Sequence, residues 1–326
     1  MLDIISVGDA TLDVFLQMNE ADADVKCTLK NEECQLCLDY ADKIPVESVI
    51  KIPGAGNGSN NAVGSSRLGM KTAMFGILGD DETGHTIAAH WKEEGISTKL
   101  VTFDKNRGTN YSTVLNYRGE RTILVFHEKR DYRWPKDLAK SEWIYYTSLG
   151  KGSEKMHSSL IAYIKKTGTK LCFQPGTHQL KLGVRALTPV IAVSEITVVN
   201  KEEAERLVGD DVRDMKELLT HLHALGCKIA VITDGPQGSY AYDGKKFLKI
   251  GIMDVPVIER TGCGDSYATA FVAALHHGKD IGEAMRWGTA NAASVLGYVG
   301  PQKGLLKLTA MRSLLRKFSS VISSEM

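Results

Sequence analysis

Short apolar runs alternate with segments of helical period along most of this chain. Leu2–Val7 and Thr72–Leu78 have the character of buried strands, and Glu82–Glu94 has the period of a helix. Later apolar runs repeat this pattern, most of them followed by helical segments: Trp143–Thr147, Lys170–Phe173, Ile196–Val199 and Ile229–Thr233. Such alternation predicts a mostly parallel sheet covered by helices on both faces. Ligands of such sheets bind at the carboxyl ends of the strands, where loops lead into helices.

Other extended stretches lie outside this rhythm. Thr11–Leu16 alternates in character, and Thr113–Tyr117 and Thr122–Phe126 form a hairpin pattern around residues 118–121. We expect a small separate sheet, from about residues 12–52 and 98–127, inserted in a single domain of residues 1–326. Residues 19–43 are polar and have no clear period, so we interpret them as an excursion that is partly loop.

The charge balance argues against a polyanionic partner. The 326 residues include 40 basic and 39 acidic ones, for a net charge of +1. We therefore expect no nucleic acid and no anionic membrane among the partners. The first residues, Met1–Gly8, lack the basic start of a signal peptide, and no run approaches the roughly 18 apolar residues of a membrane span. A cytoplasmic location is expected.

The six cysteines are too few for a disulfide scaffold in a chain of this size. Cys34 and Cys37 have the spacing of zinc ligands, and Cys27 is a candidate third ligand. No fourth ligand is evident nearby. We expect incidental thiols and keep a metal site at Cys27, Cys34 and Cys37 as the alternative.

A glycine turn before a helical segment is the first candidate for chemistry. Gly262 and Gly264 surround Cys263, and Asp265 follows at the start of the helical pattern Ser266–His277. Bare backbone N–H groups at a helix start, with the helix dipole, suit a migrating phosphoryl group. Asp265 is then placed to take the proton from an attacking hydroxyl. The alternative is a plain glycine turn with an Asp that stabilises the helix dipole.

Two further junctions follow strands. Asn200 and Glu203 are three residues apart, which suits either Mg²⁺ held through water or a capping box at a helix start. The segment Thr233–Gly238 suits either one wall of a binding site for a nucleotide base or a plain β-turn.

The third candidate lies near the start of the chain. Asp9 and Asp13 flank a strand end, and Gly54–Asn60 is a glycine-rich turn ahead of a helix. Carboxylates and amides on loops suit a polyhydroxyl ligand. Ordinary turn chemistry is the alternative.

Taken together, these motifs resemble those of the PfkB, or ribokinase-like, family of carbohydrate and nucleoside kinases. Residues 259–265 resemble the family signature D-T-x-G-A-G-D, and Asn200–Glu203 resembles its N-x-x-E. Thr233-x-Gly235 is similar to the T-x-G nucleotide element. Gly8 with Asp13 is similar to G-x(4)-D, and Ala55–Ala62 to G-G-x-x-x-N-x-A. The resemblance covers nearly the whole chain.

The resemblance implies a three-layer α/β/α fold with a mostly parallel sheet and a small β-sheet lid that often forms a dimer surface. It implies ATP with Mg²⁺, and often K⁺ near the anion hole. The implied residue roles are a general base at Asp265, an anion hole at Gly262, Cys263 and Gly264, substrate contacts at Asp13, Gly56 and Asn60, nucleotide contacts at Thr233, Gly235, Gly238 and Asn291, and Mg²⁺ contacts through water at Asn200 and Glu203.

This chain departs from the signature at Glu259, Arg260 and Cys263, and Ala55 replaces the first glycine of the G-G pair. Arg260 either stabilises the transition state or forms an ion pair with Glu259.

The favoured function is an ATP-dependent kinase acting on a hydroxyl, preferably primary, of a sugar or sugar-like molecule. Asn110, Tyr111, Thr113, Asn116 and His127 favour a sugar, and Arg107, Arg118, Arg121 and Arg130 are a candidate cluster for a sugar phosphate. A nucleoside kinase of the same fold is the nearest alternative. A catalytically silent nucleotide- or sugar-binding sensor is the alternative from another class.

Overall fold

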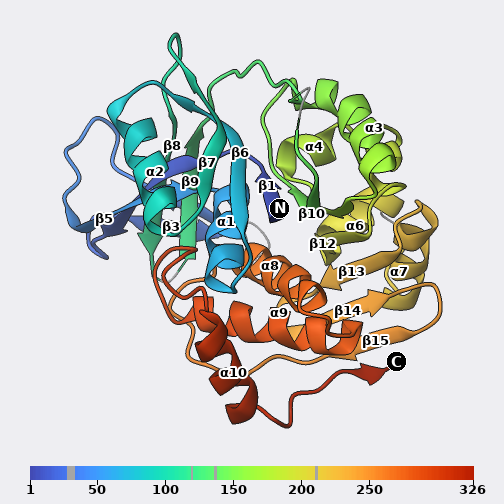
Figure 1. Cartoon of the computed structure of the whole chain (residues 1–326). Helices are drawn as coiled ribbons and strands as arrows, with labels where there is room; N and C mark the ends of the chain where they lie inside the picture. Colours follow the sequence, from blue (N-terminus) through green and yellow to red (C-terminus); the bar gives the residue numbers. More distant parts are fainter. Residues whose placement is uncertain (28–33, 119, 136–137, 210–211) are drawn as a thin grey trace.

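A large sheet forms the middle of the molecule (Figure 1). The computed structural model describes residues 1–27, 34–118, 120–135, 138–209 and 212–326. Among these, ten strands form the large sheet in the order β16-β15-β14-β13-β12-β11-β10-β1-β6-β7. Their bounds are β1 Leu2–Val7, β6 Thr72–Gly79, β7 Ser97–Asp104, β10 Ser141–Tyr146, β11 Lys170–Phe173, β12 Ile196–Asn200, β13 Ile229–Thr233, β14 Ser239–Tyr242, β15 Phe247–Ile250 and β16 Ser324–Glu325. The strands from β13 to β7 in this order are parallel, as predicted.

Helices cover both faces of the large sheet. The described helices are α1 Asn57–Arg67, α2 Glu82–Glu93, α3 His157–Thr167, α4 Thr177–Lys181, α5 Val184–Ile191, α6 Lys201–Val208, α7 Met215–Ala224, α8 Cys263–His276, α9 Ile281–Leu296 and α10 Leu308–Lys317. Successive strand residues point to opposite faces, so Ile4 packs with α8 and α9 whereas Ile5 packs with α3 and α5. The result is the expected three-layer arrangement.

The small sheet contains four strands in the order β5-β2-β8-β9. They are β2 Thr11–Met18, β5 Val46–Ala55, β8 Asn110–Tyr117 and β9 Glu120–Phe126. The predicted start of this unit at residue 98 is wrong. Residues 97–104 form β7 of the large sheet, because Val101 and Phe103 pack there with α1 and α2. Figure 1 places the small sheet beside α1 and α2, away from α3 and α7.

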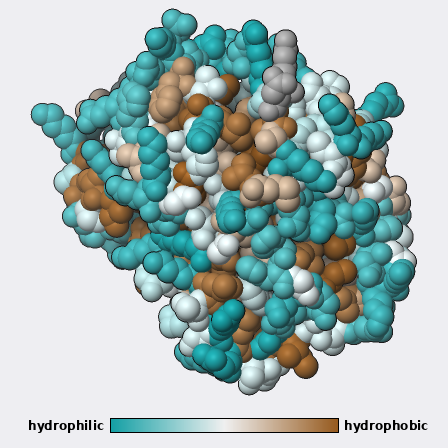
Figure 2. All heavy atoms as spheres, viewed as in Figure 1, coloured by the Kyte–Doolittle hydropathy of each residue, from teal (hydrophilic) through white to brown (hydrophobic). Residues whose placement is uncertain are grey.

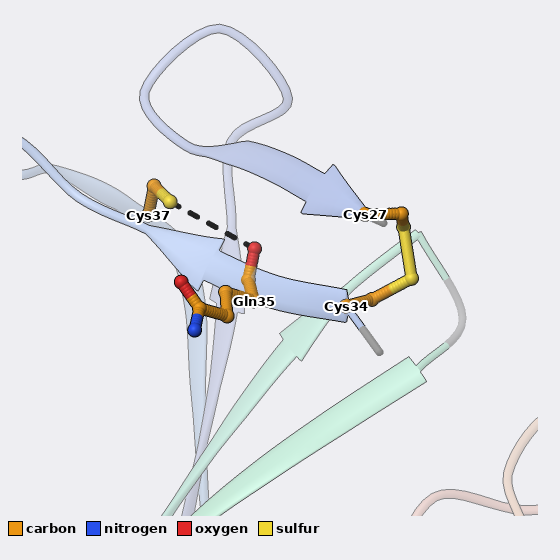
Figure 3. The surroundings of a disulfide bond; sticks show 4 residues. All are labelled: Cys27, Cys34, Gln35 and Cys37. Carbon is orange, nitrogen blue, oxygen red and sulfur yellow. Dashed lines mark hydrogen bonds between the residues drawn. A yellow bond between two sulfur atoms is a disulfide. The ribbon is translucent and has the colours of Figure 1, made fainter. Parts of the chain in front are cut away.

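A two-stranded hairpin within residues 19–43 was not predicted. Strands β3 Asp24–Cys27 and β4 Cys34–Cys37 pair in antiparallel fashion, and Cys27 and Cys34 form a disulfide bond (Figure 3). The expectation of incidental thiols is wrong for these two residues, and the zinc alternative loses two of its three ligands to the disulfide. Cys37 is a free thiol. The residues that join the two strands lie outside the described ranges.

None of the helices within the described ranges is long and apolar enough to cross a membrane.

Candidate active site

Two cavities meet at the N-terminus of α8. Cavity A, of about 460 Å³, lies between the small sheet and the carboxyl ends of the large sheet's strands, and Asp13, Asn60 and Asp265 line it. Cavity B, of about 440 Å³, is lined by Asn200 and Thr233 at the ends of β12 and β13. Cys263 and Gly264 line both cavities. The site therefore has two compartments that share one wall.

The shared wall depends on the conformation of Gly262. This residue precedes α8 with a φ of 79°, in the left-handed region that favours glycine. A Cβ added there would lie 2.4 Å from Cβ of Pro301. The turn presents the start of a 14-residue helix to the cavities, and the helix dipole favours an anion at this point. Burial raises the pKa of the Cys263 thiol to about 11, so the backbone of this residue is its contribution at neutral pH.

Asp265 lies in the first turn of α8 and is only 7% exposed. Its Oδ2 accepts a hydrogen bond of 2.8 Å from Nδ2 of Asn60. Burial raises the pKa of Asp265 to about 6; the hydrogen bond from Asn60 opposes the rise, and the charge of Glu203 adds to it. The carboxylate is thus ionised at neutral pH while remaining a better proton acceptor than an exposed Asp.

Asn60 is fixed in the first turn of α1. Its Oδ1 accepts a hydrogen bond of 3.2 Å from Nε2 of Gln302, so both ends of the amide are engaged. The start of α1 lies close against the end of β1, where a Cβ on Gly58 would be 2.7 Å from Cα of Gly8. Gly56, predicted to contact substrate, has a φ of 101° and lines cavity A.

The floor of cavity A contains two buried carboxylates. Asp13 on β2 and Asp9 after β1 each keep an Oδ1 atom without a hydrogen-bond partner among the described residues. Burial raises the pKa of Asp13 to about 6, with hydrogen bonds from Ser112 and Thr11 opposing the rise. The other oxygen of Asp9 accepts hydrogen bonds from the Tyr132 hydroxyl and from the Gly150 N–H. Two free acceptor atoms of this kind suit hydroxyl donors of a ligand.

Cavity B gathers most of the predicted nucleotide residues. Asn200, Thr233, Gly235 and Gly238 all line it. Asn200 and Glu203 also form the capping box that was the alternative interpretation. Asn200 Oδ1 accepts a bond of 2.8 Å from Glu203 N–H, and Glu203 Oε2 accepts one of 2.9 Å from Asn200 N–H.

Asn291 does not line cavity B, contrary to the prediction. Its side chain is fully buried, donating to the Ser266 carbonyl and accepting from the Leu306 N–H. Thr289, Ala292, Ala293 and Leu296 are the α9 residues that line this cavity. The periodicity of a helix that is buried nearly all round could not distinguish these faces.

The two charged departures from the signature behave differently. Glu259 is 6% exposed, and its carboxylate accepts from the N–H groups of Thr261 and Gly300 and from the Thr261 hydroxyl. Arg260 is exposed and lines both cavities. The described contacts include no ion pair between Glu259 and Arg260. The cation near Glu259 is Arg121 of the small sheet, with Nη1 3.8 Å from Oε1.

The candidate cluster of arginines is not gathered at the site. Arg107 and Arg130 form ion pairs with Asp104. Arg118, on the turn after β8, lies near Glu20. Arg121 alone of the four lines a cavity.

The polar residues chosen for sugar contact are also mostly elsewhere. His127 lines cavity A, but Asn110 is engaged with Ala10 and Glu128, and the small-sheet wall of the cavity consists mainly of Ser112, Ile123 and Val125.

Several cavity residues were not singled out from the sequence. Ser148 lies two residues after the end of β10, Gln174 directly follows β11, and both line cavity A. The rule that ligands bind at the carboxyl ends of parallel strands would have identified both. Nothing comparable marks Arg121, because its position depends on how the small sheet sits over the large one.

Fold and site together define a small-molecule transferase: two ligand cavities joined at an anion-favouring helix start, with a buried carboxylate beside it. A family model described as "pfkB family carbohydrate kinase" matches residues 25–308. This chain belongs to the pfkB family of carbohydrate kinases.

Named relatives are similar to this chain in sequence, and a solved structure is similar to it in fold. A 5-dehydro-2-deoxygluconokinase from Shouchella clausii is 28% identical over 282 residues, which cover 80% of this chain and 86% of the relative. An enzyme of the same name from Bacillus subtilis is 28% identical over 260 residues, covering 74% and 80%. The structure of Arabidopsis thaliana ribokinase complexed with ribose and ATP has a TM-score of 0.78 at 19% identity, covering 97% of this chain and 99% of the other. At that identity the likeness shows the fold.

Proposed function

We propose that this protein transfers the γ-phosphoryl group of ATP to a hydroxyl, preferably primary, of a sugar or sugar acid bound in cavity A. ATP-dependent sugar phosphorylation is the activity of its family and of its named relatives. The observation that carries the residue assignment is the position of Asp265: a buried carboxylate with a raised pKa, lining cavity A beside the wall that both cavities share.

In this mechanism the attacking hydroxyl gives its proton to Asp265 as its oxygen bonds to the γ-phosphorus. Gly262, Cys263 and Gly264 present the helix start to the negative charge that develops on the phosphoryl oxygens. Asp13, Asn60 and Gly56 hold and orient the acceptor. Asp9 adds a second carboxylate, to which the family resemblance gave no role. The small sheet acts as a lid that keeps water from the phosphoryl group.

The nucleotide occupies cavity B in this proposal, against Asn200, Thr233, Gly235 and Gly238. Kinases of this family use ATP with a divalent metal, generally Mg²⁺. Glu203 fits such an ion: it is a carboxylate beside the nucleotide cavity, and only Oε2 is engaged in the capping box. Glu203 and Asn200 would hold the ion through water, and the ion would neutralise phosphate charge. We keep K⁺ near the anion hole as part of the proposal.

The substrate proposal follows the named relatives and the cavity floor. The 5-dehydro-2-deoxygluconokinases act on a sugar acid, and the free acceptor atoms of Asp9 and Asp13 suit a polyol. A nucleoside kinase is the second candidate, because the apolar wall of Ile123 and Val125 also suits a base. The sensor alternative predicts binding without turnover.

The test is ATP consumption with Mg²⁺ against 5-dehydro-2-deoxygluconate, fructose, ribose and adenosine, with Asp265→Ala as the control. We expect turnover with one sugar or sugar acid that falls about 10³-fold or more in the variant while ATP binding persists. Turnover with adenosine alone would replace the sugar by a nucleoside. ATP binding without turnover on any acceptor would support the sensor.

We also propose a homodimer through the outer face of the small sheet. Tyr111, Leu124 and Phe126 are paired neighbours on that face and are exposed. Figure 2 shows further hydrophobic side chains at the left edge of the view, where Figure 1 places β5 of this sheet. A second copy of the chain would cover them. Light scattering should give twice the monomer mass, and Leu124→Lys should return the protein to one chain.

The proposed location is the cytoplasm, where ATP is abundant. The Cys27–Cys34 disulfide is the observation that opposes this location, because cytosolic thiols are normally kept reduced.

A further inference from the structure

Arg121 on β9 faces the anion-favouring turn across cavity A. It alternates along the strand with Ile123 and Val125, which line the same cavity. Cavity A is bounded on the opposite side by residues 262–265. The charge of Arg121 reaches this turn: burial and Glu259 raise the pKa of Cys263, and Arg121 opposes that rise.

Within the described ranges, the guanidinium of Arg121 has a loose ion pair with Glu259 and no hydrogen bond. Its Nη1 lies 3.8 Å from Glu259 Oε1, which is longer than a hydrogen bond, and its side chain is 32% exposed. Glu259 does not depend on Arg121, because its carboxylate already accepts hydrogen bonds of 3.0 Å from Thr261 N–H and 2.7 Å from Gly300 N–H. Arg121 can therefore turn from Glu259 to an incoming anion without leaving a buried carboxylate unpartnered.

The charge around cavity A favours such a move. Asp9, Asp13 and Asp265 bring three carboxylates to its lining, and a γ-phosphoryl group adds further negative charge. The permanent cations lining the cavity are Arg121 and Arg260. Arg121 alone of these belongs to the small sheet, so its approach to the phosphoryl group depends on how that sheet closes.

We infer that Arg121 is a catalytic residue of the phosphoryl transfer, contacting the equatorial oxygens of the migrating group when the small sheet closes. This inference rests on the proposed function. The acceptor oxygen bonds to the γ-phosphorus as the bond to the bridging β–γ oxygen breaks, the electron pair leaves with ADP, and the proton goes to Asp265. Arg121 contributes positive charge and gives up no proton.

The test compares Arg121→Gln with Arg118→Gln, which removes an arginine on the turn between β8 and β9 that lines neither cavity. The acceptor is whichever of 5-dehydro-2-deoxygluconate, fructose and ribose the unmodified enzyme phosphorylates. We expect Arg121→Gln to lower kcat about 100-fold with little change in the KM of the acceptor. Arg118→Gln should stay within about twofold of the unmodified enzyme.

A second measurement distinguishes a direct effect of the Arg121 charge on the migrating phosphoryl group from a structural role of Arg121 in the small sheet. Guanidinium ions at low millimolar concentration should restore part of the kcat of Arg121→Ala, and equal sodium chloride should not. A raised acceptor KM with unchanged kcat would overturn the inference and make Arg121 a substrate contact. Equal losses in both glutamine variants would also overturn it. An unmodified enzyme without kinase activity would instead refute the proposed function on which the inference rests.

Discussion

The side-chain amide of Asn60 donates a hydrogen bond of 2.8 Å to the carboxylate of Asp265, although 205 positions separate the two residues. The bond joins the first turn of α1 to the first turn of α8. It therefore connects the residue proposed to hold the acceptor with the residue proposed to take its proton. In the proposed mechanism, acceptor binding and proton transfer are therefore coupled through this one hydrogen bond.

The pH dependence of turnover should follow Asp265. Burial raises its pKa to about 6, and the base must be ionised to accept a proton. We expect kcat/KM to be level above pH 7 and to fall about tenfold per unit below pH 6. A pH–rate profile from pH 5 to 8.5 checks this, with circular dichroism at each pH as the control for folding. A level profile through pH 6 would contradict the assignment of the base.

Removing the amide of Asn60 should move that profile. The hydrogen bond from Asn60 lowers the pKa of Asp265 against the effect of burial, so Asn60→Ala should raise the pKa further. Activity should fall more at pH 6.5 than at pH 8.5. The matched control is Asn61→Ala. The amide of Asn61 donates a hydrogen bond of 3.1 Å to the Thr269 hydroxyl and does not contact Asp265 in this way. If both variants shift the acidic limb equally, the effect arises from packing of α1.

The ionised carboxylate of Asp13 should lower the free energy of unfolding at neutral pH. Burial raises its folded pKa to about 6 from the ordinary value of 3.8, so the folded protein holds this proton more tightly than the unfolded chain. The charged carboxylate therefore opposes folding above pH 6, and this cost disappears as the pH falls towards 4. Asp13→Asn should increase the free energy of unfolding by up to about 3 kcal/mol at pH 7.5. Urea titrations at pH 7.5 and pH 4.5 check this, and an equal gain at both would contradict it.

The strand and helix pattern was predictable because buried strands and helices each produce a characteristic local spacing of apolar residues. The prediction of Lys170–Phe173 was confirmed to the residue, and the helix predicted from Glu82 ends at Glu93. The antiparallel edge of β14, β15 and β16 was not predicted. Its strands are only two to four residues long, too short for alternation to stand out.

The site was predictable where a residue follows a strand or begins a helix, and less so elsewhere. Asp13, Asn60 and Asp265 meet in cavity A because each lies at such a junction or beside it. Asn291 was expected to face cavity B because α9 is buried nearly all round, and its periodicity does not show which buried side lines a cavity. Arg121 was named only as one of four arginines, since no local pattern reports which of them a folded sheet turns inward.

The disulfide should stabilise its hairpin without changing catalysis. The bond between Cys27 and Cys34 joins residues seven positions apart, and a loop of this size is worth about 2 kcal/mol in the chain-entropy account. Cys34→Ser should therefore increase amide hydrogen exchange in β3 and β4, with kcat unchanged. Cys37→Ser removes the free thiol alone and is the control. A loss of kcat in Cys34→Ser only would show that the hairpin communicates with the active site.

The wall that Cys263 and Gly264 form between the two cavities has a consequence for ligand design. A single compound that joins an adenosine to a polyol through a short phosphate chain could occupy both compartments at once. Once one end is bound, the other is held near its own compartment at an effective concentration in the millimolar range. Such a compound should bind far more tightly than either half alone, and its best chain length would measure how far apart donor and acceptor are held.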